Sequence, residues 1–171
     1  MKYYGIKKEV LKYHTTIGFK ERVDIIFNPP AKSIAERVSQ GLGWLSRGRQ
    51  CFDEAERFLY ISQRLRLCYL TDDKSAPVIQ TIARHASTIM SEIPVERERI
   101  AAKLRRLYAV RSSLVHAGYR EVSFADAAEL QAIVEHIYWT VLNKSEINIS
   151  SSISHESIAS ASYGASWQPP S

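Results

Sequence analysis

The sequence has few of the features that mark extracellular, membrane or metal-binding proteins. Its two cysteines, Cys51 and Cys68, are too few for a disulfide scaffold, and their spacing matches no zinc site. No apolar run approaches the roughly 18–20 residues that span a bilayer, and the N-terminus lacks the apolar segment of a signal peptide. The histidines follow no metal-ligand spacing. We therefore expect a cytoplasmic protein with no metal, no cofactor and no membrane contact.

The composition is that of an ordinary globular protein. The chain has 171 residues, of which 45% are apolar and 24% charged, which suits one domain with tails. The formal net charge is +5. This charge favours a polyanion as partner, although many basic domains bind none.

The first thirty residues read as an N-terminal appendage (1–30). Residues 15–19 and 23–27 are β-branched and aromatic enough for short strands, whereas residues 8–13 could form a helical turn. Asn28-Pro29-Pro30 then breaks any regular structure.

Residues 31–143 carry a helical pattern throughout. Apolar residues recur at helical spacing in segments bounded by caps, prolines and glycines. The first expected helix begins at Ser33, which forms a capping box with Glu36, and the second spans about 53–70. The third runs from Ser75 and Pro77 to Met90. The fourth spans about 95–117 behind Pro94, and the fifth begins at Ser123 with Asp126. We predict an all-α, up-and-down bundle of four to five helices.

Residues 144–171 are rich in serine and predict a flexible tail. Tyr163 and Trp167 are unusual in such a segment, so the tail could dock on a partner.

The segment Tyr108–Gly118 carries the most informative chemistry. Arg111 supplies a fixed cation with a fork of donors suited to phosphate, and His116 can carry a proton near neutral pH. On an ideal helix the two lie about 140° apart. They can therefore meet at one phosphate only if the helix bends or ends near His116, if Arg111 swings round, or if a second copy of the chain contributes.

The run Arg-Ser-Ser-Leu-Val-His over 111–116, with Tyr108 before it and Ala-Gly after it, resembles the HEPN superfamily. The Apea-like branch is the most similar, because the run Glu-Arg-Phe-Leu at Glu56–Leu59, which starts a long helix, also resembles this branch. The resemblance covers roughly Ile34–Leu142. Two positions depart from the pattern: Ser112 stands where many members have Asn or Asp, and Gln63–Arg66 stands where the branch carries an Ala-Leu-Glu-like run.

The resemblance implies a helical bundle that forms a homodimer through its motif helices. Many such proteins are metal-independent endoribonucleases of toxin–antitoxin, CRISPR and phage-defence systems, and others are non-catalytic. By this resemblance His116 and Arg111 would carry out RNA cleavage. Ser112 lies one turn before His116 and could orient its imidazole. An antitoxin or a larger defence complex would be a partner.

Basic and aromatic residues around the motif suggest RNA contacts. The candidates for phosphate binding or base stacking are Arg99, Lys103, Arg105, Arg106, Tyr108 and Tyr119. Equally, the basic stripe could be a solvated face that Glu96 and Glu98 partly neutralise. Arg111 could pair with an acid, and His116 could interact only with the end of its helix. Three hypotheses follow: an endoribonuclease, a non-catalytic module that binds RNA, a nucleotide or a protein, and a structural helical domain.

Overall fold

The computed structural model describes residues 19–68, 78–117, 121–144, 146–148, 150–162, 164 and 167–168. Its helices are α2 (Phe19–Phe27), α3 (Ile34–Gln50), α4 (Glu54–Ser62), the 3₁₀ helix η1 (Gln63–Cys68), α5 (Val78–Met90), α6 (Pro94–His116), α7 (Phe124–Lys144) and α8 (Ser151–Ala161). Within these residues the β pairing is an isolated bridge between Ser33 and Ser150, and no strand forms. The predicted all-α class is confirmed.

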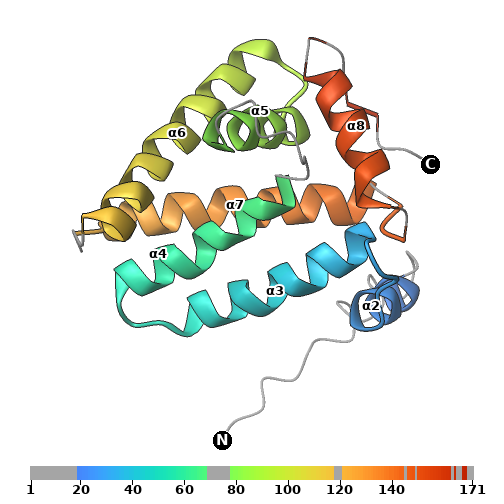
Figure 1. The fold of residues 1–171 in the computed structure, drawn as a ribbon, viewed down its shortest axis with the longest axis horizontal. Coiled ribbons are helices and arrows are strands. Elements are labelled where there is room, and N and C mark those ends of the chain that lie inside the picture. The colour runs from blue at the N-terminus through green and yellow to red at the C-terminus, as the bar shows by residue number, and fades with distance from the viewer. Residues whose placement is uncertain are drawn as a thin grey trace, which may run out of the picture.

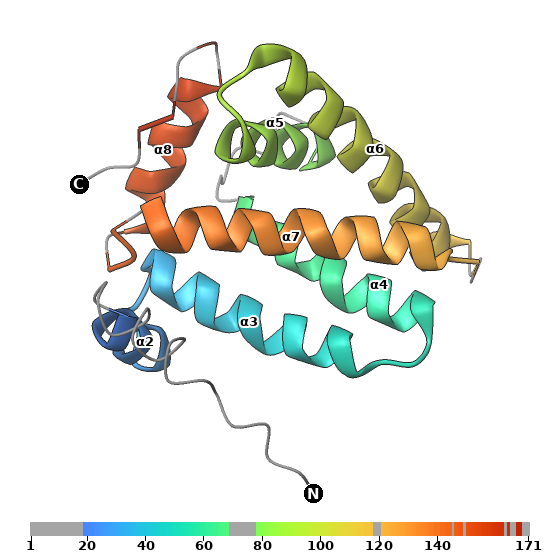
Figure 2. The same cartoon turned by 180° about the vertical axis from the view of Figure 1, so that it is seen from behind.

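Helix α7 forms the middle of the molecule. Helices α3 and α4 lie on one side of it and α5 and α6 on the other, while α8 covers the end near α5 (Figures 1 and 2). The most extensive helix–helix contacts are those of α5 with α6, of α3 with α4, and of α4 with α7. Helix α6 slants steeply across the direction of α7 in both views. The regular up-and-down arrangement is therefore only partly followed.

Local capping fixes the predicted helix starts. The Ser33 hydroxyl accepts a hydrogen bond from the Glu36 amide at 3.1 Å, and Pro94 is the first residue of α6. At α7 the Ser123 hydroxyl accepts from the Asp126 amide, also at 3.1 Å. The expectation of a start at Ser75 and Pro77 falls outside the described residues.

The second predicted helix, about 53–70, is shorter than expected. Helix α4 ends at Ser62, and the chain continues directly as the 3₁₀ helix η1. Near this point the Ser62 hydroxyl donates to the Leu59 carbonyl at 2.8 Å, and Arg64 Nε donates to the Tyr60 carbonyl at 3.1 Å. These side-chain donors bind carbonyls in the last turn of α4. At this point the α-helix tightens into a 3₁₀ helix.

The strand predicted at 23–27 is wrong, because these residues belong to α2. Ile25 and Ile26 pack against the core, and Arg22 donates to the Leu142 carbonyl at the end of α7. Tertiary packing therefore overrides the β propensity of this run. Helix α2 ends before Pro29 and Pro30, as expected, whereas residues 8–13 and 15–18 lie outside the described part.

The flexible tail predicted for 144–171 is also corrected. The structure shows α8 there, with Ile158, Ala161 and Trp167 each no more than 4% exposed. The Ala35 amide donates to the Ile147 carbonyl at 2.7 Å, and Arg97 Nη1 donates to the Ala161 carbonyl at 3.2 Å. A few apolar side chains suffice to hold this serine-rich segment on the chain's own core. Tyr163 lies outside the described residues.

The core follows the apolar stripes expected from the sequence. Fully buried large side chains come from α4, α6 and α7, namely Phe58, Ile61, Leu104, Leu107, Leu130 and Ile137. Across the described residues, none of the helices is both long enough and apolar enough to cross a bilayer.

Candidate functional site

The Arg–His motif lies in the last two turns of α6, where this helix meets the start of α7 (Figure 1). The helix runs without interruption from Pro94 to His116 and stops at Ala117, whose amide donates to the Ser113 carbonyl at 3.0 Å. The motif therefore stays on one helix, and no break separates Arg111 from His116. The helix does end next to His116, but no bend lies between the two residues, so Arg111 must swing round or a second copy must contribute.

Arg111 lies in the line of the buried side chains Leu107 and Leu114. It is half-buried, and its guanidinium carbon is 5.4 Å from the ring centroid of Tyr108. Within the described residues it makes no ion pair, so the structure does not bear out pairing with a core acid. The ring of Tyr108 supports the Arg111 guanidinium but carries no negative charge that would neutralise it.

His116 is exposed, and Ser112 one turn before it is half-buried on the same flank of α6. Leu114, between them in sequence, is buried, which fixes how the end of the helix sits. Since Arg111 is about 140° away around the helix axis, a single chain presents the imidazole and the guanidinium in different directions.

Three of the four basic residues predicted to bind RNA are ion-paired. Arg99 pairs with Glu96 at 2.6 Å on the same helix, as the sequence suggested. Lys103 pairs with Glu129 of α7 at 2.9 Å. Arg106 reaches Asp126 at 2.5 Å and Glu129 at 2.6 Å. These three cations therefore already have anionic partners within the protein.

The ion pairs between α6 and α7 also shift the acidity of their members. The hydrogen bond from Arg106 lowers the pKa of Asp126, and the one from Lys103 lowers the pKa of Glu129. The same carboxylates raise the pKa of Arg106. The sequence alone does not reveal Asp126 and Glu129 as partners of these cations, because the two acids belong to another helix. Their i,i+3 spacing at the start of α7 was the one available signal.

The remaining candidates divide between two places. Arg105 lies on another flank of α6, where it lines a cavity with Gln80, Thr81 and Arg84 of α5. Tyr108 is half-buried beneath Arg111, which favours support of the arginine over base stacking. Tyr119 falls outside the described residues.

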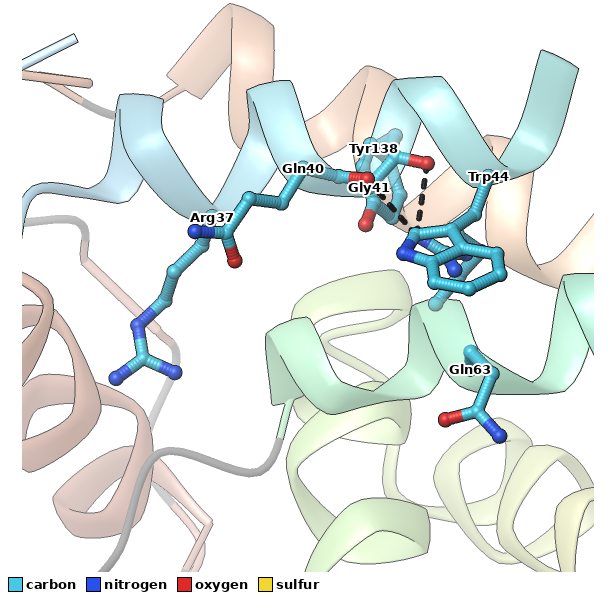
Figure 3. Close-up of a pocket in the computed structure, with 7 residues that line it drawn as sticks. Arg37, Gln40, Gly41, Trp44, Gln63 and Tyr138 are labelled. Atoms are coloured by element: carbon cyan, nitrogen blue, oxygen red, sulfur yellow. Dashed lines mark hydrogen bonds between the residues drawn. The ribbon is translucent and has the colours of Figure 1, made fainter.

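A second hollow of about 240 Å³ lies where α3, η1 and α7 meet (Figure 3). One of its lining residues is Arg64, which is buried and donates to the carbonyls of Gln40 and Gly41 at 3.0 Å each. The guanidinium of Arg64 also lies 5.0 Å from the centroid of Trp44. Arg64 thus joins η1 to α3. From the sequence, the run Gln63–Arg66 stands out only as a departure from the family pattern, and nothing in it indicates this contact.

Among the described residues, no three His, Cys, Asp or Glu side chains lie close enough together to hold a metal ion. No protein-family model, no curated protein and no solved structure matches the chain. The resemblance to the HEPN superfamily therefore rests on the residues quoted for it, the motif at 111–116 with its neighbours and the run at Glu56–Leu59.

Proposed function

We propose that the protein is a metal-independent endoribonuclease of HEPN type in which Arg111 and His116 act on the scissile phosphate. The observation that supports this most is electrostatic. Arg99, Lys103 and Arg106 of α6 are all neutralised by carboxylates, whereas Arg111 has no anionic partner among the described residues. A cation and an exposed imidazole at one helix end suit an RNA phosphate.

In the proposed reaction the RNA 2′-oxygen attacks the adjacent phosphorus in line. The bond from phosphorus to the 5′-oxygen breaks, which leaves a 2′,3′-cyclic phosphate and a 5′-hydroxyl. A base takes the proton from the 2′-hydroxyl, and an acid gives a proton to the leaving 5′-oxygen. His116 would perform one of these transfers, with Ser112 orienting its ring. Arg111 would stabilise the charge that develops on the non-bridging oxygens.

A second copy of the chain would complete the site. Arg111 and His116 diverge on one helix, so a homodimer with the ends of two α6 helices side by side would bring Arg111 of one copy toward His116 of the other. The second histidine would then supply the other proton transfer. A role as a toxin or phage-defence effector, with an antitoxin or a larger complex as partner, is part of this proposal and rests on the resemblance.

A non-catalytic module that binds RNA, a nucleotide or a protein is the second candidate. It is favoured by the divergence of Arg111 and His116 around the axis of α6, which within one copy of the chain presents the two groups in different directions. Such a module would bind RNA in a salt-dependent manner without cutting it.

Cleavage of labelled single-stranded RNA in EDTA separates these functions. We expect His116→Ala and Arg111→Ala each to lower the rate by about 10²-fold or more, because each removes a group that acts in the transition state. His136→Ala is the matched control, since His136 is an exposed histidine of α7. Products should end in cyclic phosphates, and an all-DNA strand should stay intact.

Equal background cleavage by all four proteins would overturn the nuclease. RNA binding that survives His116→Ala, without cleavage by any variant, would instead establish the binding module.

A further inference from the structure

One side of α3 carries an exposed aromatic ring between two arginines. We call it the Trp44 face, and it consists of Arg37, Gln40, Trp44 and Arg47. On an ideal helix these four residues fall within an arc of about 80°, and the two arginines lie about 15 Å apart along the axis. Trp44 is 39% exposed, Arg47 is exposed and Arg37 is half-buried. A single extended ligand can therefore contact all four side chains.

Two hollows meet at Trp44. The hollow of about 240 Å³ between α3, η1 and α7 contains Gln63, and Figure 3 shows the Trp44 ring pointing from α3 toward this residue. The other hollow measures about 340 Å³, and its described lining residues are Ser39, Gln40, Gly43, Trp44 and Arg47. Both are at the small end of the roughly 300–1,000 Å³ that ligand sites occupy, which suits a single base better than a large cofactor.

The Trp44 ring is held in place by its neighbours inside the protein. The ring centroid of Tyr60 in α4 lies 5.7 Å from that of Trp44. The guanidinium carbon of Arg64, which is buried, lies 5.0 Å from the same Trp44 centroid. Because these contacts orient the indole before any ligand arrives, a base that stacks on it orders little of the protein.

Arg47 also lies over this ring, with its guanidinium carbon 5.1 Å from the centroid. An exposed cation–π contact changes an equilibrium only about two- to fivefold. Stacking of a base on an aromatic side chain changes it about five- to 150-fold. A base can therefore displace the exposed Arg47 from the ring, and the released guanidinium can bind the neighbouring phosphate.

The two arginines of the Trp44 face differ from Arg49, which follows Arg47 by two residues. Arg49 pairs with Glu135 of α7 at 2.6 Å. Arg37 and Arg47 take part in none of the ion pairs formed among the described residues. A guanidinium without a carboxylate beside it keeps its attraction for an external anion, and its donor fork matches phosphate oxygens. The charge of this face thus complements a polyanion.

We infer that the Trp44 face binds single-stranded RNA. One base stacks on Trp44, and Arg37 and Arg47 hold the phosphates on its two sides. The amides of Gln40 and Gln63 supply donors and acceptors for base edges. Surfaces that bind single strands combine cations with a stacking platform in this way. The inference takes its class of ligand from the proposed function and adds an RNA contact on α3, a helix outside the Arg–His motif.

The test measures binding of a labelled, fully 2′-O-methylated RNA strand, which cannot be cleaved by the proposed route, by fluorescence anisotropy at several salt concentrations. We expect Arg47→Ala to weaken binding about tenfold and to reduce the slope of log K against log salt by about 0.7, the value for one phosphate of a single strand. Arg49→Ala removes the same charge from the same helix but from an ion pair, so it should bind nearly as the wild type does.

A second set of variants tests the stacking. Trp44→Ala should weaken binding about tenfold or more, because it removes the platform, but it should leave the salt slope nearly unchanged, because it removes no charge. Trp44→Phe keeps an aromatic ring and should retain most of the affinity. Trp139→Ala is the control: Trp139 is 63% exposed, so exposure alone would predict the larger loss there.

The RNA-binding face is overturned if the wild type does not bind, if Arg47→Ala binds as the wild type does, or if Arg49→Ala or Trp139→Ala loses as much affinity as its counterpart. Arg47 is exposed, so its variant decides the question even where Trp44→Ala fails to fold. If Arg47→Ala weakens binding but no variant affects RNA cleavage, the face stands and the nuclease fails. If His116→Ala abolishes cleavage while Arg47→Ala binds normally, the nuclease stands and the face fails.

Discussion

The cations of α6 occupy different electrostatic environments although they are close in sequence. Lys103 and Arg106 face the carboxylates at the start of α7, Arg105 faces an arginine across a cavity, and Arg111 lies over an aromatic ring. A guanidinium beside carboxylates is already neutralised, whereas one without them keeps its attraction for an external anion. The ability of each cation to attract an external anion therefore depends on whether it has an acidic partner, and not on its distance from the motif in sequence.

The Asp126–Arg106 pair should make stability depend on pH. Because the folded protein lowers the pKa of Asp126, the pair stabilises the fold above the ordinary Asp pKa of about 3.9, and this contribution is lost as the pH falls through the lower folded value. Urea unfolding of wild type and Asp126→Asn should differ by up to about 1 kcal/mol near pH 6, since the Arg106 side chain is 52% exposed. The difference should shrink toward pH 3.

Glu98→Gln provides the control for this measurement. Glu98 is exposed and makes no ion pair within the described residues, so its variant should follow the wild type at every pH. A stability difference between wild type and Asp126→Asn that stays constant from pH 6 to pH 3 would contradict the assignment.

At the scale of elements, the start of a helix is encoded locally and its end often is not. Ser33, Pro94 and Ser123 act on amides within their own first turn, so the sequence is sufficient to place these starts. The end of α4 involves Arg64, whose guanidinium also binds carbonyls of α3 more than twenty residues away. That contact depends on the tertiary structure, which is why a continuous helix over 53–70 was expected.

Helix α3 offers a matched pair of glycines for testing its packing on α7. A Cβ at Gly41 would lie 1.8 Å from the Tyr138 hydroxyl oxygen and 2.5 Å from ring atom Cζ, and Tyr138 is only 4% exposed. Gly41→Ala should therefore destabilise the protein by about 1–3 kcal/mol, because α3 or the buried ring must move. Chemical denaturation would measure this.

Gly43 lies two residues further along the same helix, and a Cβ there would meet nothing within 4 Å. Gly43→Ala should stabilise the protein by up to about 1 kcal/mol, the gain in helix propensity. If the two alanine variants were equally stable, the close approach of α3 and Tyr138 would be refuted.

For the molecule as a whole, the sequence predicts which residues are apolar but not which distant segments they cover. The stripes of the predicted bundle are buried as expected, and the motif lies at the end of the predicted helix. The ion pairs with α7 and the cavity beside α5 each join residues about twenty or more positions apart, so periodicity could not reveal them. The packing of α8 was missed for a similar reason, because its few apolar residues are diluted by serine.

Trp167 tests whether the segment after Lys144 belongs to the fold. This side chain is 4% exposed, so Trp167→Ala should lower the free energy of unfolding by about 3–5 kcal/mol, as expected for a large buried aromatic residue. Trp139, which is 63% exposed, supplies the control, and Trp139→Ala should change stability by about 0.5 kcal/mol or less. Trp167→Phe should keep most of the stability, because it retains an aromatic ring and removes an indole N–H that is buried without an acceptor among the described residues. If the segment were a detached tail, all three variants would unfold at the same urea concentration as the wild type. If it is docked, Trp139→Ala should be the most stable of the three variants, Trp167→Phe less stable, and Trp167→Ala the least stable.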